Sequence, residues 1–134
     1  MKHEEALKEQ ISLMLQKAER SIAAAEELFR GGYFDFVSSR AYYGAFYAVE
    51  AILLSENKTT STHSGAISEF SKLFIKTNIF SKETGKSLSR LFENRQIGDY
   101  DFGMDITESE ARTDIDAAAN VVESIKKYLQ ENLS

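Results

Sequence analysis

The stretch LFENRQIGDYDFG, residues 91–103, brings several residues suited to anion chemistry within a few positions of one another. At helical spacing its inward stripe runs through Leu88 and then Leu91 or Phe92 to Arg95, where a guanidinium stands in place of an apolar side chain. Arginine binds phosphate through paired hydrogen bonds and stays charged at physiological pH. Arg95 is therefore a candidate anion-binding residue at the mouth of a cleft.

Two further polar residues, Asp99 and Tyr100, follow Arg95 by about one helical turn. The sequence predicts that the helix breaks at Gly98 and that a loop rich in glycine and aspartate follows. If the helix or a tight turn continues, Asp99 and Tyr100 lie beside Arg95. The structural alternative is an Arg95–Asp99 ion pair that locks the helix end, with Tyr100 packed on the core. Spacing alone favours this alternative and leaves the binding role open.

A second constellation lies in SSRAYYGAFYAVEAIL, residues 38–53. Its polar and aromatic members recur at steps of three and four and so share one helical face: Arg40, Tyr43, Tyr47 and Glu50. Aromatic residues at this spacing more often belong to a core than to a base-stacking surface. The face is nevertheless a second candidate lining for a cleft.

Two single residues also stand out. Gly44 lies in the middle of an expected helix, where glycine costs about 1 kcal/mol relative to alanine. It therefore indicates a close approach by another helix, for which a second subunit is one source. His63 is the histidine inside the expected folded body and opens the third expected helix. Its simplest interpretation is a surface or capping residue.

The apolar periodicity predicts an all-α, up-and-down bundle of about five helices. The chain contains no proline and no strand pattern. The expected helices cover about 2–30, 34–57 and 63–77, followed by one capped by Ser81 and a last one capped by Thr107. Thr107 and Glu110 match a capping box. The second helix is apolar on nearly every side, which places it at the centre of the fold or of an interface.

Length and composition predict one domain, residues 1–134, with a core large enough to fold without metal or disulfides. Cysteine is absent and only two histidines occur, so we expect no metal site and no cofactor. No phosphate-binding glycine loop, zinc-protease motif or di-iron ligand pattern is present. No membrane-length apolar run or signal peptide is found, and we expect a cytoplasmic protein.

The charge is uneven along the chain. The net charge of −5 argues against coating nucleic acid by bulk attraction. Residues 71–95 nevertheless carry six Lys or Arg against two Glu, whereas residues 96–116 are strongly acidic. The basic segment is either a solvated helix face, which is the commoner case, or a local patch for a phosphate backbone.

Four segments, in this order and spacing, resemble the HEPN domain family over nearly the whole chain. They are KAERSIAAAEELFRGGYFDFVSSRAYYGAFYAVEAILL, the connection THSG, the arginine-then-tyrosine segment RQIGDY and the capped helix start TESEA. The similarity is greatest to small stand-alone prokaryotic members, which are often encoded beside a minimal nucleotidyltransferase. The resemblance implies a homodimer in which the arginine motifs of two subunits meet in one cleft.

The resemblance also implies a function. Many HEPN proteins are metal-independent ribonucleases with an R-x4-6-H motif. There the histidine acts as general base on a ribose 2′-hydroxyl, and the arginine stabilises charge on the phosphate. Several are toxins, silenced when a nucleotidyltransferase partner adenylylates a tyrosine near the motif.

In this chain the motif is altered at one position. Arg95 matches the arginine and Gln96 the polar residue after it, but the histidine position falls on Tyr100. A phenol with a pKa near 10 is a poor base at neutral pH, so catalysis would need His63 or an activated Tyr100.

We therefore expect a toxin–antitoxin or stress-response protein that binds RNA or a nucleotide through Arg95 and acts with a nucleotidyltransferase. Gln96 and Asp99 would assist Arg95, while Tyr100 would stack, donate a hydrogen bond or accept a modification. Arg40, Tyr43 and Tyr47 would line the cleft. The alternatives are an active metal-independent ribonuclease and a non-catalytic protein-interaction module.

Overall fold

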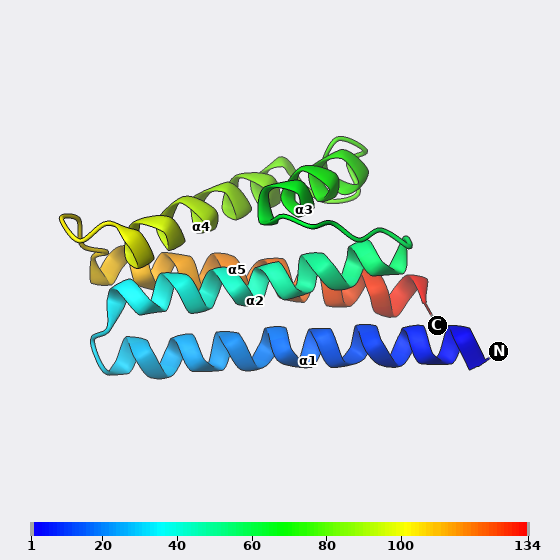
Figure 1. Ribbon diagram of the computed structural model, residues 1–134, viewed down its shortest axis with the longest axis horizontal. Helices are drawn as coiled ribbons and strands as arrows, with labels where there is room; N and C mark the ends of the chain where they lie inside the picture. The colour runs from blue at the N-terminus through cyan, green and yellow to red at the C-terminus, as the bar shows by residue number, and fades with distance from the viewer. Residues whose placement is uncertain (1, 134) are drawn as a thin grey trace.

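The computed structural model describes residues 2–133, and these fold into a bundle of helices (Figure 1). The elements are α1 (Lys2–Arg30), α2 (Phe34–Ser55), α3 (His63–Phe70), the π-helical segment η1 (Ser71–Ile75), α4 (Lys82–Tyr100) and α5 (Glu108–Asn132). No strand occurs in the described part of the chain. The expected all-α bundle of about five helices is confirmed. None of the helices within residues 2–133 has the length and apolar character needed to span a membrane.

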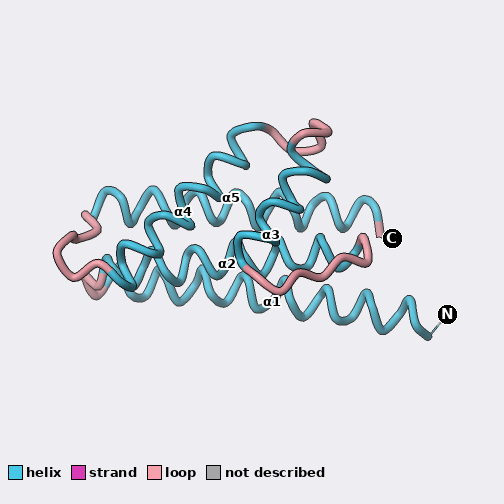
Figure 2. The backbone as a smooth tube through the Cα atoms, turned by 45° about the horizontal axis from the view of Figure 1, so that its top comes forward, coloured by secondary structure: helices cyan, strands magenta, loops and turns pink. Residues whose placement is uncertain are grey.

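The helices are arranged in three layers, with α2 at the centre (Figures 1 and 2). On one side α2 packs against α1, and on the other it supports α3 and α4, while α5 lies beside it. More than half of the residues of α2 are buried, because it touches every other long helix. This explains why its sequence is apolar on nearly every side.

Gly44 is required by the contact between α1 and α2. A Cβ atom at this position would lie 2.6 Å from Ile22 Cδ1 and 3.2 Å from the carbonyl oxygen of Ala18. The sequence predicted such a close approach by another helix, which the structure confirms. The approaching helix is α1 of the same chain, however, so Gly44 carries no information about a second subunit.

The helix boundaries follow from local capping. The side chains of Thr62 and Ser81 accept hydrogen bonds from backbone amides at the starts of α3 and α4. Thr107 and Glu110 form the reciprocal capping box at the start of α5, as the sequence predicted. The third expected helix, 63–77, divides into α3 and the wider turn η1.

The end of α4 differs from the prediction. Gly98 does not break the helix, which continues to Tyr100. The glycine is needed for packing instead, since a Cβ atom there would lie within van der Waals overlap of the backbone carbonyl oxygen of Asp35 on α2. This close approach of α4 to α2 places Asp99 and Tyr100 on the helix, one turn beyond Arg95.

A buried carboxylate fixes α4 against α2 and α5. Asp114 of α5 is fully buried and accepts a hydrogen bond of 2.7 Å from the Ser38 hydroxyl. From α4 it receives the Asn94 side-chain amide at 3.0 and 3.1 Å and the Arg90 Nε at 3.0 Å. Because Asn94 precedes Arg95, this network fixes the rotation and height of the helix that carries the candidate site.

Candidate functional site

Arg95 of α4 lies against α2, with only 14% of its side chain exposed. Its Nη2 donates a hydrogen bond of 2.8 Å to the hydroxyl oxygen of Tyr43. Its Nε lies 3.2 Å from Asp99 Oδ2, an ion pair between positions four residues apart on α4. Nε is also buried without a hydrogen-bond partner among the described residues, because the carboxylate oxygen lies out of line with the N–H bond. The Arg95–Asp99 pair named as the structural alternative is therefore present.

Three tyrosine rings surround the guanidinium. The central carbon of Arg95 lies 5.6 Å from the ring centre of Tyr42, 5.4 Å from that of Tyr43 and 5.6 Å from that of Tyr100. Such cation–π contacts stabilise a cation without using its hydrogen-bond donors. Tyr42 is fully buried, but Tyr100 is 67% exposed. The expectation that Tyr100 packs on the core is wrong, because its helix position directs most of the ring to the surface.

The candidate face of α2 is divided by the structure. Arg40 lies over the Tyr43 ring at 5.0 Å, and the Ser39 hydroxyl donates to Asp99 Oδ2 at 3.3 Å, so this part of α2 borders Arg95. Tyr47 touches the Tyr43 ring, with ring centres 6.0 Å apart, but its own ring faces Lys17 of α1. The candidate residues of α2 therefore extend from Arg95 toward α1 instead of lining one cleft together.

Gln96 lies next to the arginine on a different face of α4. It lines a surface hollow with Tyr100 and Asp101 beyond it and Glu93 before it. The hollow lies on the outer side of α4, where Tyr100 is mostly exposed. Gln96 and the exposed part of Tyr100 thus extend the Arg95 site toward solvent.

His63 belongs to the same cluster, although it stands 32 residues before Arg95 in the chain. Its Nδ1 is 2.9 Å from the Tyr42 hydroxyl, and its ring stacks on Phe46 with a centre-to-centre distance of 4.2 Å. The Tyr43 ring meets it edge-on at 5.7 Å. The interpretation of His63 as a surface or capping residue is wrong, because Thr62 provides the cap and His63 packs against three aromatic rings.

Burial and charge shift the protonation of these groups. The pKa of His63 is lowered, first by burial and then by the positive charge of Arg95, so its imidazole is neutral at pH 7. Burial raises the pKa of Tyr42, which therefore remains a phenol. Burial alone would lower the pKa of Arg95, but the hydrogen bond to Tyr43 and the charges of Tyr43, Tyr100 and Asp99 together outweigh it, so the pKa is raised. The cluster thus holds a fixed positive charge beside a neutral histidine.

The lowered pKa of His63 gives a pH-dependent stability. Below the usual pKa of histidine, His63 takes up a proton more readily in the unfolded chain than in the folded one. The His63 contribution to the free energy of unfolding is therefore fully present at neutral pH and is lost as the pH falls. We expect the free energy of unfolding in urea to decline from about pH 7.5 to about pH 5.5, with a slope of at most about 1.4 kcal/mol per pH unit. His63→Gln should flatten this decline. The control His3→Gln, at an exposed position on α1, should leave it in place. An unchanged slope in His63→Gln would contradict the burial argument.

Sequence reasoning missed two contributors to the site. Tyr42, which joins His63 to the Arg95 cluster, lies on a helix that the sequence predicts to be apolar on nearly every side, and no spacing singles it out. Asp114, whose network positions α4, had a visible signal, since it lies three residues after Ala111 and next to Ile115 on the buried stripe of α5. No group of three or more metal-ligating side chains is found within residues 2–133.

The chain is similar to known proteins over most of its length. The model of the HEPN domain family matches residues 11–128. A protein of Methanocaldococcus jannaschii named "Putative toxin MJ0142" is 35% identical over 122 residues, which cover 91% of this chain and 83% of the relative. A second protein of that organism, "Putative toxin MJ0605", is 31% identical, covering 95% of this chain and 94% of its own. A "UPF0332 protein" of Thermotoga maritima is 36% identical over 93 residues, or 69% of this chain and 70% of the relative.

Proposed function

Because this chain belongs to the HEPN domain family, we propose that it is a toxin-type member that binds RNA through the Arg95 cluster. Two relatives that align over most of their length carry toxin names, which supports the first half of the proposal. The second half rests on the chemistry of the arginine. The bound group is a phosphate of the RNA backbone, with a neighbouring base on Tyr100.

The observation that carries the proposal is the unused donor capacity of Arg95. A guanidinium has five N–H donors, and here one is used in the hydrogen bond to Tyr43. Asp99 faces Nε without forming a hydrogen bond. The tyrosine rings hold the plane in place, so the remaining donors are oriented before a ligand arrives. Because Nε is buried, a phosphate oxygen can complete the hydrogen bonds of the remaining Nη N–H groups, with little loss of side-chain entropy.

Tyr100 supplies the second contact in this proposal. Its ring is packed against Arg95 on one side and is 67% exposed. An exposed aromatic ring beside a phosphate-binding arginine is a stacking surface for an unpaired base. Arg40 and Tyr43 border the site from α2. Asp99 orients the guanidinium, and Gln96 can hydrogen-bond to a base or sugar.

The proposal includes two protein partners. One is a second copy of the chain, whose Arg95 would face the same phosphate region. The other is an antitoxin of the nucleotidyltransferase class. Its target would be the Tyr100 hydroxyl, which would displace pyrophosphate from ATP and retain the adenylyl group. The accessibility of Tyr100 and its contact with Arg95 support this choice, since a bulky anionic group there would occupy the site.

Binding of a labelled single-stranded oligoribonucleotide, followed by fluorescence anisotropy at low salt, tests the proposal. Arg95→Gln is expected to weaken binding by about 10- to 100-fold, as expected for loss of a charged hydrogen-bond donor. Arg20→Gln removes the same charge from an exposed position on α1 and should have little effect. Equal affinity of wild type and a folded Arg95→Gln variant would refute the site. A lower melting temperature in that variant, without any RNA binding by wild type, would instead favour the interaction module.

A second candidate function, metal-independent cleavage of RNA, is favoured by the position of His63. Its Nδ1 is engaged by Tyr42, and its Nε2 has no hydrogen bond within the described residues. A neutral imidazole beside a phosphate-binding arginine is suited to accept a proton from a ribose 2′-hydroxyl. The oxygen then attacks phosphorus, the bond to the 5′-oxygen breaks, and that oxygen takes a proton from water.

Incubation of RNA with protein in EDTA, followed by analysis of the ends, tests this candidate. Wild type should yield 2′,3′-cyclic phosphates, and His63→Gln should stop cleavage while keeping RNA affinity. Tyr100→Phe should still cleave, because its phenol is not the base. If RNA remains intact with wild-type protein, the site binds RNA without cutting it.

A further inference from the structure

We propose that single-stranded RNA bound at Arg95 continues along the outer face of α4 to a lysine ridge formed by Lys72, Lys76, Lys82 and Lys86. This inference rests on the proposed function and adds the length and path of the RNA. The site would then distinguish an RNA strand from a free nucleotide. Three observations support this inference: the charge of the ridge, the hollows along α4 and the side chains between the ridge and Arg95.

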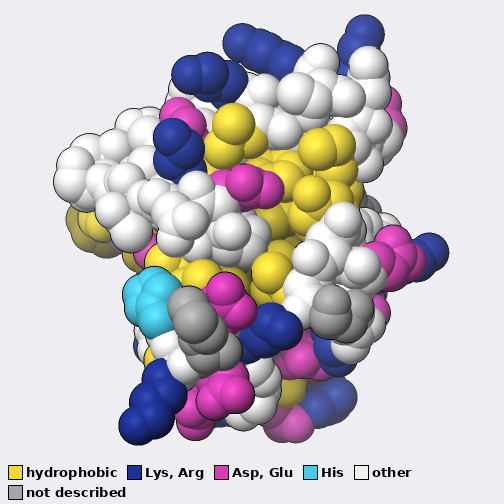
Figure 3. Space-filling view, turned by 90° about the vertical axis from the view of Figure 1, so that its right-hand side faces the viewer, with side chains coloured by type: hydrophobic (Ala, Val, Ile, Leu, Met, Phe, Trp, Pro, Cys, Tyr) yellow, Lys and Arg dark blue, Asp and Glu magenta, His cyan; other side chains and the backbone are white. Residues whose placement is uncertain are grey.

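The lysine ridge is a local basic region in an acidic protein. From residue 63 to residue 95 the chain has six Lys or Arg and three Asp or Glu, whereas the rest has ten against eighteen. Figure 3 shows Lys and Arg side chains gathered at the top of the molecule, over the part formed by α3, η1 and α4. Lys72 and Lys76 come from η1 and the turn after it, and Lys82 begins α4. The ridge therefore brings two chain segments together.

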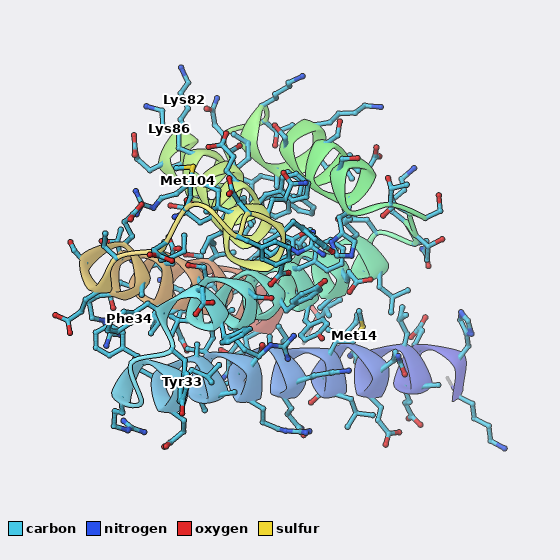
Figure 4. The ribbon with its side chains drawn as sticks, turned by 60° about the vertical axis from the view of Figure 1, so that its left-hand side comes forward. Met14, Tyr33, Phe34, Lys82, Lys86 and Met104 are labelled. Carbon is cyan, nitrogen blue, oxygen red and sulfur yellow. The ribbon has the colours of Figure 1, made fainter. Side chains whose placement is uncertain are left out.

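The lysines of the ridge are available to a ligand. Lys72, Lys76 and Lys82 are exposed and have no ion pair within residues 2–133. Lys86 is 3.5 Å from Glu83, but both side chains are at least three-quarters exposed, so this pair is weak. In Figure 4 the labelled Lys82 and Lys86 extend outward from the top of α4. A solvated helix face would be equally exposed. The shape of the neighbouring surface is what favours a phosphate-binding patch over that interpretation.

Three surface hollows lie along α4, from Lys86 of the ridge to Tyr100, whose ring contacts Arg95. The first, about 440 Å³, lies between η1 and α4 and is lined by Lys86, Ser71 and Gly85 among others. The second lies between α3 and α4, and the third lies beside Gln96 and Tyr100. Glu93 lines all three, so the hollows adjoin at this residue, and we call this row of hollows along α4 the furrow.

Side chains on one face of α4 follow this furrow, and all but Lys82 line its hollows. They recur at steps of four and three residues: Lys82, Lys86, Ser89, Glu93, Gln96 and Tyr100. At 1.5 Å per residue the strip is about 27 Å long. It has cations at one end and an exposed aromatic ring at the other, with hydroxyl and amide groups between them. This is the chemistry that binds a single strand without strong sequence preference.

The acidic residue in the strip sets a limit on how the RNA lies. Glu93 would repel a phosphate placed directly above it, but its carboxylate can accept hydrogen bonds from base amino groups. Across the furrow, α3 presents Ser64 and Ser68 and the apolar Ile67. The strand would therefore present bases to the middle of the furrow and phosphates to its two ends. A duplex, with its bases paired and its phosphates on both edges, fits this pattern poorly.

Two RNA probes of different length distinguish binding at the lysine ridge from binding at Arg95. One probe is a dinucleotide with a single bridging phosphate, and the other is a single-stranded RNA of about ten nucleotides, long enough to follow the strip. The test variant is Lys72→Gln/Lys76→Gln/Lys82→Gln. The control, Lys2→Gln/Lys8→Gln/Arg20→Gln, removes the same charge from exposed positions on α1. Circular dichroism confirms that each variant is folded.

The ridge variant should bind the longer RNA about tenfold more weakly than wild type. A plot of its log affinity against log salt concentration should also be less steep by about 2, since each of the three lost phosphate contacts contributes about 0.7 to the slope. Its affinity for the dinucleotide should be unchanged, and the α1 control should match wild type in both assays. Arg95→Gln should weaken the binding of both RNAs. If the ridge variant bound the longer RNA as tightly as wild type, the proposed RNA path along α4 would be refuted, but RNA binding at Arg95 would not. Failure of wild type to bind either RNA would overturn both.

Discussion

Replacing Asp114 by alanine is expected to lower the free energy of unfolding by about 3–5 kcal/mol. The carboxylate is fully buried and accepts hydrogen bonds from Ser38, Asn94 and Arg90. Its removal leaves a buried hydroxyl and a buried amide without a partner and the Arg90 cation without its counter-charge. The unpaired hydroxyl and amide are costly in an interior that water does not reach, whereas the 42% exposed Arg90 side chain adds less.

Urea denaturation at neutral pH measures this loss. The matched control is Asp116→Ala, two residues further along α5, where the carboxylate is 66% exposed and pairs with Arg112. Exposed pairs contribute about 0–1 kcal/mol, so this variant should be nearly as stable as wild type. Similar losses in the two variants would mean that the buried network does not hold α4 in place.

Replacing Tyr42 by alanine is expected to cost about 3–5 kcal/mol as well, for a different reason. Tyr42 is fully buried, and its ring contacts Phe46, Phe92 and His63. Alanine would leave a cavity where α2, α3 and α4 meet. Because Arg95 also packs on this ring, the variant should bind RNA more weakly even where it remains folded.

Tyr42→Phe separates the ring from its hydroxyl. It keeps the packing and removes the contact with His63 Nδ1, so the expected loss in a thermal or urea melt is about 1 kcal/mol. RNA affinity should stay close to that of wild type, because Arg95 contacts the ring and not the hydroxyl. If Tyr42→Ala were as stable as Tyr42→Phe, the ring could not be the centre of this packing.

The helical architecture was predictable because its signals are local. Apolar periodicity, the absence of proline and the Thr107–Glu110 capping box each act within a few residues. The helix end at Gly98 was predicted wrongly for a related reason. Glycine allows both a helix stop and a close backbone contact, and the choice between them depends on Asp35, more than sixty residues earlier.

The candidate site was predictable in part. Arg95, Asp99 and Tyr100 are neighbours in the sequence, and the structure brings the first two into an ion pair. The contact of His63 with Tyr42 joins separate helices across a polar connection, and no spacing rule indicates it. Resemblance to a family assigned Tyr100 to the position of the motif histidine. Only the fold placed another histidine close to Arg95.

Nuclear magnetic resonance of arginine side chains shows whether the Arg95 guanidinium itself contacts RNA. The Arg95 Nε–H is buried, which slows its exchange with water, and the Arg95→Lys variant identifies its signal. On titration with single-stranded oligoribonucleotide we expect this signal to shift and to saturate with the affinity measured by anisotropy. An Arg95 signal that stays in place while those of Arg90 or Arg112 move would contradict the claim.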